Sequence, residues 1–139
     1  MMKRTFPVIL AVVIALGAVF PVILQAGTTS ACMGLTPGYW KNHIDDWPAG
    51  FAPGDLFDVE FGLVNKNPGL TLEGALRTGG GKFTALNRHA AAALLNSYEF
   101  PYPDFYTTAH VIEMVQEAYD TGDWQSAKNA LEYANEYGD

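Results

Sequence analysis

The chain has little cysteine and little positive charge. Cys32 is its only cysteine, so its own residues cannot form a disulfide and the fold depends on its core. Eight Lys and Arg stand against fifteen Asp and Glu in 139 residues, a net charge of −7. Nucleic acid and anionic membranes select basic patches, so this balance argues against both as partners. No Gly-x-Ser-x-Gly motif or other recognisable catalytic set is present, which favours a non-enzymatic protein.

Charge is absent altogether from residues 6–26, directly after Lys3 and Arg4. Such a run predicts either a signal peptide or a helix that spans the membrane, which takes about 20 residues. In both cases the basic start stays in the cytoplasm and the rest of the chain is exported. We therefore expect a leader or anchor over residues 1–31 and a single exported domain over residues 32–139, either secreted or attached to the cell surface. The membrane is contacted only through the N-terminal segment.

Small residues at the end of the leader favour its cleavage. Ala26 and Ala31 are of the kind that signal peptidases prefer, which predicts cleavage near Gly27 or Cys32. A retained anchor is the alternative. Cys32 is also a candidate lipidation site, although Thr29 stands where a lipobox carries Leu. Without Lys3 and Arg4 the net charge of −7 becomes −9.

Hydrophobic periodicity predicts three helices. The first covers residues 82–98, the second begins at Thr107 or Thr108 and runs to about residue 120, and the third follows Asp123 as its N-cap. Prolines after residue 100 end the first helix. Its predicted buried stripe consists of Phe83, Leu86, Ala90, Ala93, Leu94 and Ser97. Thr121-Gly122 predicts a tight antiparallel turn between the last two helices, and Lys128 and Glu132 are spaced to pair on the third.

The segment before these helices differs from them in composition and in hydrophobic periodicity. Residues 33–69 are rich in Pro, Gly, Asp and aromatic residues without a sustained period, which predicts an irregular segment with short helical or extended pieces. Its apolar side chains are too many to stay solvated, so we expect it to cover the helices. A short helix over residues 70–77, capped by Thr71, is a further prediction. Together these features predict an all-α fold, a small bundle of three to five helices with an irregular aromatic-rich N-terminal segment.

An aromatic motif, Thr-Pro-Gly-Tyr-Trp-Lys-Asn-His, covers residues 36–43 and is followed by Trp47-Pro48. Core packing with internally bonded indole N–H groups is one interpretation of its tryptophans. The other is an aromatic platform for a ligand such as a sugar. The residues of that candidate binding site are Tyr39, Trp40, Asn42 and Trp47.

Histidines are the candidates for metal binding. His43 ends the aromatic motif and His89 lies on the apolar stripe of the first long helix, so the two could converge on a divalent metal with Asp45 or Asp46. The alternative is that His89 has a backbone or carboxylate partner, because no two histidines have the helical spacing of metal ligands. No cofactor is firmly implied.

Two further segments carry chemistry-bearing residues. Residues 55–60 hold three carboxylates but lack the calcium-loop pattern, which favours a solvated loop. Residues 78–82, Thr-Gly-Gly-Gly-Lys, precede a helix as a phosphate loop does. The segment departs from the Walker pattern at Leu76 and Phe83, which favours a helix lead-in.

The motif carries a resemblance to a known family. Thr36, residues 38–43 and Trp47-Pro48 match its Thr-x-Gly-(Tyr or Phe)-Trp-Lys-Asn-His opening and nearby Trp-Pro. Further matches are His89 with Ala92, Ala93, Leu95 and Asn96, then Tyr102-Pro103, residues 111–116 and residues 122–128. On these residues the chain resembles an uncharacterised helical module of secreted and surface-attached prokaryotic proteins. The resemblance implies secretion and an α-rich fold, and it implies no activity.

Two function classes follow. The first is an exported non-enzymatic module that packs against other surface or extracellular proteins, or against itself, as a subunit of an extracellular assembly. The second is a small metal- or ligand-binding protein, or a hydrolase, that uses His43 and His89. The lack of a catalytic set and the small size of the exported part favour the first.

Overall fold

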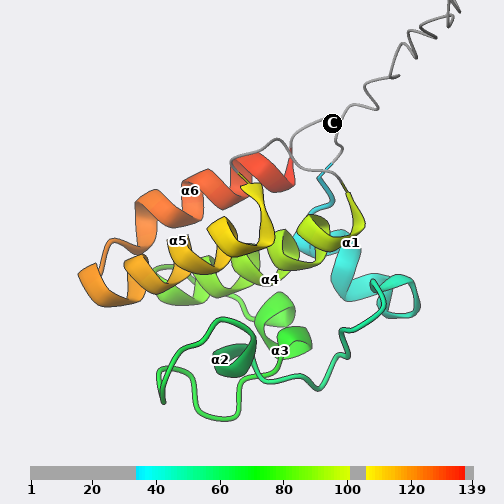
Figure 1. Ribbon diagram of the computed structural model, residues 1–139, viewed down its shortest axis with the longest axis horizontal. Helices are drawn as coiled ribbons and strands as arrows, with labels where there is room; N and C mark the ends of the chain where they lie inside the picture. The colour runs from blue at the N-terminus through cyan, green and yellow to red at the C-terminus, as the bar shows by residue number, and fades with distance from the viewer. Residues whose placement is uncertain (1–33, 101–105, 137–139) are drawn as a thin grey trace, which may run out of the picture.

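The computed structural model describes residues 34–100 and 106–136, and these form a helical structure (Figure 1). The predicted leader and Cys32 lie outside the described residues. The helices are α1 Pro37–Asn42, the 3-10 helix η1 Ile44–Asp46, α2 Phe57–Glu60, α3 Leu72–Arg77, α4 Phe83–Glu99, α5 Thr108–Thr121 and α6 Trp124–Asn135. In these two ranges there is no strand, only a single antiparallel bridge between Leu56 and Thr71. The predicted all-α class is confirmed.

The long helices begin where the sequence predicts. Thr107 and Asp123 cap α5 and α6, and Thr71 caps α3, each with a side-chain oxygen that accepts the backbone N–H three residues on. These bonds satisfy amides that the first turn of a helix leaves free. Gly122 ends α5 in the left-handed conformation, with φ at 80°. This glycine forms the tight turn that brings α6 back beside α5.

The predicted number of helices is too low. The described residues contain six α-helices, because α1 and α2 lie in the segment predicted to be irregular with short helical or extended pieces, and the predicted number did not include such pieces. α1 has six residues and α2 only four, lengths too short to show a helical period in the sequence. Both are held by packing, since isolated helices of this length are not stable in water.

The centre of the molecule is α4. It packs along α6, α3 and α5, and α1 meets it near its C-terminal end (Figure 1). Four consecutive alanines, residues 90–93, are all 0% exposed. Consecutive positions point to different sides of a helix, so α4 is covered on every side there. The small side chains let the neighbouring helices approach it closely.

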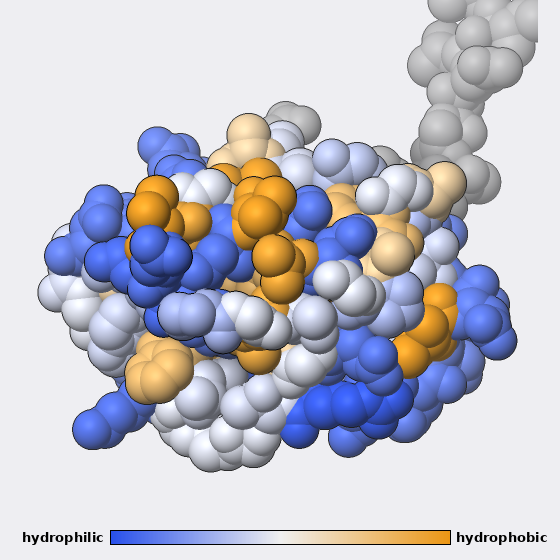
Figure 2. Space-filling model, turned by 90° about the horizontal axis from the view of Figure 1, so that it is seen from below, coloured by the Kyte–Doolittle hydropathy of each residue, from blue (hydrophilic) through white to orange (hydrophobic). Residues whose placement is uncertain are grey.

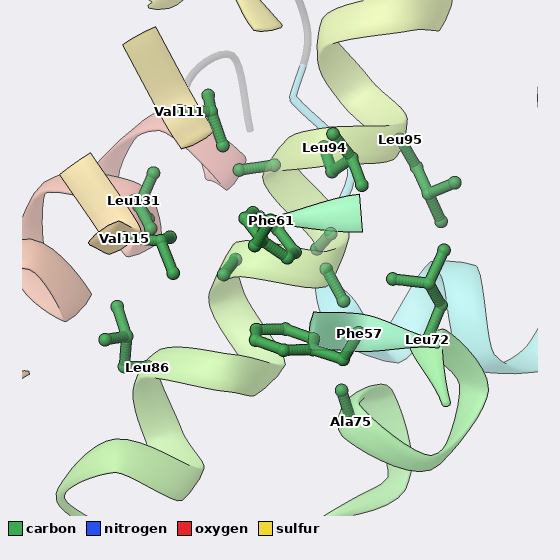
Figure 3. Packing of buried hydrophobic residues seen from close by; sticks show 14 of the residues in the cluster. Phe57, Phe61, Leu72, Ala75, Leu86, Leu94, Leu95, Val111, Val115 and Leu131 are labelled. Atoms are coloured by element: carbon green, nitrogen blue, oxygen red, sulfur yellow. The ribbon is translucent and has the colours of Figure 1, made fainter. Parts of the chain in front are cut away.

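Two phenylalanines from the N-terminal segment complete the core. The rings of Phe57 and Phe61 are 0% exposed and lie 4.4 Å apart between centroids. Figure 3 shows them beside α4, with Leu72 of α3 on one side and Val115 of α5 on the other. The expectation that this segment covers the helices is therefore correct for α2.

Phe83 was expected in the buried stripe of the first long helix. It is 44% exposed, because it lies in the first turn of α4.

Replacement of Ala92 by Leu tests the packing around α4. Three added carbons have no space at a position that is 0% exposed, so we expect the free energy of unfolding to fall by about 1–3 kcal/mol. The matched control is Ala109→Leu on the exposed side of α5, where a change within about 0.5 kcal/mol is expected. Urea unfolding measures both. Equal effects would show that α4 is not closely covered.

Candidate functional site

The aromatic motif forms helix α1 and its caps. The Thr36 hydroxyl accepts the N–H of Tyr39 at 3.3 Å, and Pro37 occupies the first helical position, which needs no amide donor. The Asn42 side-chain amide donates to the Gly38 carbonyl at 2.9 Å. Each of these residues therefore has a structural role within the motif.

The two tryptophans of the motif are bonded inside the molecule. Trp40 is 1% exposed, and its indole N–H donates to Asn96 Oδ1 at 2.9 Å. The indole of Trp47 donates to the Trp40 carbonyl at 3.0 Å. The core-packing interpretation is correct for both. Trp40 is buried, so its ring presents no face to a ligand. Tyr39, Asn42 and Trp47 keep partial or full exposure, and a ligand site at these residues stays a prediction.

Asn96 of α4 is the buried residue on which the motif converges. Its Oδ1 accepts from the Leu35 N–H at 3.0 Å as well as from Trp40, and its Nδ2 donates to the Leu35 carbonyl at 2.8 Å and to Asn135 Oδ1 at 2.9 Å. All four bonds that a side-chain amide can make are formed. Asn135 in turn donates to the His89 carbonyl at 2.9 Å. The amide joins the N-terminal segment, α1, α4 and α6.

The sequence alone predicts no role for Asn96; this residue is only one of those that match the secreted helical module. The signal that could have found it is polarity: Asn96 directly follows the apolar run over residues 90–95 and Asn87 lies three positions before that run. Both are buried, at 2% exposure for Asn87 and 0% for Asn96. Buried amides need internal partners, so an asparagine at such a position indicates a polar network.

His43 and its acidic neighbours lie at the surface. The imidazole stacks on the ring of Tyr39 with 4.0 Å between centroids and 9° between planes. Its Nδ1 lies 2.8 Å from the Tyr39 carbonyl. Asp45 and Asp46 are exposed on η1, in the first turn of that helix. His43 thus ends α1 and has partners within its own motif.

His89 is buried in the interface between α4 and α6. It is 6% exposed, its Nε2 lies 3.6 Å from Glu132 Oε1, and its Nδ1 has no hydrogen-bond partner in the part of the chain that the structure describes. Burial lowers its pKa from 6.5 to about 4; the charge of Glu132 opposes this shift, and Arg88 and Lys128 add to it. Lys128 and Glu132 form the predicted ion pair.

The proposed metal site needs these residues to meet. Across residues 34–100 and 106–136 no three His, Cys, Asp or Glu side chains form a group that could hold a metal ion. The contacts of His43 are with Tyr39, whereas His89 faces Glu132. The expected convergence with Asp45 or Asp46 is therefore not seen. Metal analysis of the purified protein remains the direct measurement.

A second polar network holds the loop that follows α2. Asp58 accepts the backbone N–H groups of Lys66 and Asn67, both at 2.8 Å, and the Asn67 side-chain amide at 2.9 Å. Asn67 Oδ1 accepts from Asn87 at 2.8 Å, and the Tyr119 hydroxyl lies 2.9 Å away. The Asp58 carboxylate, one of three considered for calcium, thus organises the loop and ties it to α4 and α5.

Apolar side chains are exposed around α2. Leu56, Val59 and Val64 are 46%, 69% and 77% exposed, and with Leu63 and Pro68 they line a hollow of about 260 Å³. We call these five residues the α2 surface. Figure 2, which views the molecule from the side where α2 lies in Figure 1, shows apolar groups at the surface among hydrophilic ones. Clustered exposed apolar residues are typical of interaction sites.

The comparisons with known proteins add no assignment. No family model matches the chain, and neither a curated protein nor a solved structure matches it. The resemblance to the secreted helical module therefore stays a prediction. None of the helices in residues 34–100 and 106–136 has the length and apolar character needed to cross a membrane.

Removal of the Asn96 amide tests the first network. Asn96→Ala leaves the buried indole N–H of Trp40 and both part-buried backbone groups of Leu35 without partners, so we expect a loss of about 3–5 kcal/mol in the free energy of unfolding. The control, Asn129→Ala on the exposed face of α6, removes only a bond to Gln125 and should cost less than about 1 kcal/mol. Urea unfolding gives both values, and similar losses would contradict the central place of Asn96.

The buried His89 predicts a pH dependence of stability. With a pKa near 4 it stays neutral when folded, whereas the unfolded chain takes up a proton below about 6.5. Stability should therefore fall by up to about 3 kcal/mol as the pH is lowered from 6.5 to 4. Glu132, whose pKa is lowered chiefly by its bond to Lys128, adds a loss below 4.5.

Urea unfolding at several pH values measures this slope. His89→Gln should remove most of the slope between pH 6.5 and 4.5, whatever it does to absolute stability. His110→Gln, at a position where the imidazole is exposed, should leave the slope unchanged. A slope that persists in His89→Gln would assign the effect to other groups.

Proposed function

We propose that the protein is an exported, non-enzymatic module that acts by packing against another protein at the cell surface or in an extracellular assembly. The observation that carries this proposal is the α2 surface, with three apolar side chains between 46% and 77% exposed around one hollow. Burial of such side chains against a partner releases about 25 cal/mol per Å² of apolar area. In a loop that stays in solvent, these exposed apolar side chains contribute no such free energy.

The backbone that carries the α2 surface is held in one conformation by the core and by hydrogen bonds. Phe57 and Phe61 anchor α2 in the core, and the Asp58 carboxylate holds the following loop through three hydrogen bonds. A surface held in one conformation loses little entropy when a partner binds. The same side chains on a loosely held loop would bind more weakly, so the second polar network supports an interaction role.

Export supports the choice of partner class. The charge-free run over residues 6–26 after Lys3 and Arg4 is of the kind that directs a chain across the membrane. Proteins outside the cytoplasm are then the partners within reach. The acidic balance of the exported part, −9 without the two basic residues, is consistent with a protein partner and disfavours nucleic acid.

Photo-crosslinking in the producing cells tests the proposal. A photoreactive phenylalanine analogue in place of Val59 should give a discrete adduct with one partner, because this side chain is 69% exposed on the α2 surface. The matched control places the same analogue at Tyr133 of α6, which is 63% exposed and outside that surface. We expect no discrete adduct there.

A second substitution separates docking from incidental contact. Val64→Asp introduces a charge at a position that is 77% exposed, so it should leave the melting temperature within about 2 °C of wild type. It should abolish the adduct at position 59, because a docked partner would have to bury the carboxylate. Adducts of equal yield at positions 59 and 133, or an adduct that Val64→Asp does not affect, would contradict the proposal.

A further inference from the structure

Charge is unevenly distributed over the described residues. The α5–α6 hairpin, residues 107–136, carries six carboxylates and one lysine, and that lysine is paired with Glu132. Residues 66–88 carry four basic side chains and one carboxylate, Glu73, which is paired with Arg77. In Figure 1 α5 and α6 form the upper part of the molecule and α3 lies in the lower part. A chain with a strongly acidic net charge therefore has a distinct basic region.

The acidic region contains a groove. Between α5 and α6 lies a hollow of about 270 Å³, and we call it the acidic groove. Its apolar lining consists of Met114, Ala118, Ala127 and Ala130, and its polar lining of Glu117, Thr121, Asp123 and Ser126. The three alanines are too short to fill the space between two helices, so the groove stays open to solvent. Its apolar floor within an acidic rim fits an apolar side chain flanked by positive charge.

The basic region has this pattern. Lys66 and Lys82 are exposed, and within the described residues neither forms an ion pair. Phe83 follows Lys82 directly, is 44% exposed, and shares a hollow of about 230 Å³ with Lys66. We call these three residues the basic face. The ring of Phe83, which packs edge-on against Trp124, is still 44% exposed and has Lys82 next to it in the chain and Lys66 in the same hollow. An exposed ring with lysines near it is the complement of an apolar floor with carboxylates at its edge.

We propose that the acidic groove binds the basic face of a second copy of the same chain. At a net charge of −9 two copies repel each other in most orientations, whereas this orientation sets free lysines against carboxylates. Because the groove and the face are different surfaces, the contact is heterologous and can repeat into a ring or a filament. It can also form a dimer in which each copy binds the face of the other in its groove. The contact involves neither Val59 nor Val64. The hollow of the basic face borders the α2 surface at Pro68, so the two contacts are tested at separate positions.

Sedimentation velocity of the protein produced from its full-length gene tests this contact. We expect species larger than a monomer at about 50 mM salt and their loss at about 500 mM salt, because screening at this ionic strength weakens exposed charge pairs. Glu117→Lys and Lys82→Glu should each weaken association at least tenfold, since each sets like charges against each other. Asp45→Lys makes the same change of charge as Glu117→Lys at an exposed position outside both surfaces, and it should not weaken association.

A mixture of the Glu117→Lys and Lys82→Glu variants tests whether the groove and the face bind each other. The groove of the Glu117→Lys variant, with a positive charge at position 117 beside Asp123, then meets the face of the Lys82→Glu variant, with a negative charge at position 82 beside Lys66. The two unchanged surfaces also match, so alternating copies should recover association. Glu117→Gln and Lys82→Gln are the milder variants if a charge reversal impairs folding, which circular dichroism detects.

Three results would overturn the contact. They are a monomer at all concentrations in low salt, an equal loss in Asp45→Lys, and a mixture that fails to recover. None of them bears on the adduct at position 59, so failure here leaves the proposed function to its own test.

Discussion

The four hydrogen bonds of the Asn96 side chain are the constraint that places Leu35, α1 and the end of α6 around α4. This amide holds the backbone of Leu35 and the indole of Trp40 against the end of α4, and it reaches α6 through Asn135. The approach is close: a Cβ on Gly34 would lie 2.2 Å from the Ala134 carbonyl oxygen. Chain ends that are not tied down tend to fray. Here one fully bonded amide fixes the start and the end of the described chain to the same helix.

A second amide network braces the other half of α4. Asn87 lies two and a half turns before Asn96 and connects the loop after α2 with Tyr119 of α5. Burial raises the pKa of the Tyr119 hydroxyl, so this group stays neutral and can donate its one proton to either of the two asparagine Oδ1 atoms beside it. Between the networks run the four buried alanines, which have no polar atoms in their side chains. Small residues set how closely the helices pack, and the amides at either side set their register.

The sequence predicted those parts of the fold that have a period or a cap. The three long helices and α3 were found from apolar spacing and from Thr71, Thr107 and Asp123, because these signals are local. α1 and α2 were not, since four to six residues show no period and their stability comes from contacts far along the chain. The same reason hid the partners of Asn96, which lie 39 to 61 residues away. It also made His43 and His89 look like a pair, although their contacts prove to be separate.

The aromatic motif is the most distinctive part of the sequence, yet its residues are largely committed to structure. Thr36 and Pro37 start α1, and Trp40 and Trp47 bond internally. A side chain whose polar atoms are satisfied inside the protein has little left to offer a ligand. The apolar groups around α2 are the reverse case, because the sequence gives them no recognisable motif and the fold nevertheless leaves them exposed. A distinctive motif can therefore mark how a chain folds, while the surface that meets a partner is found only from exposure.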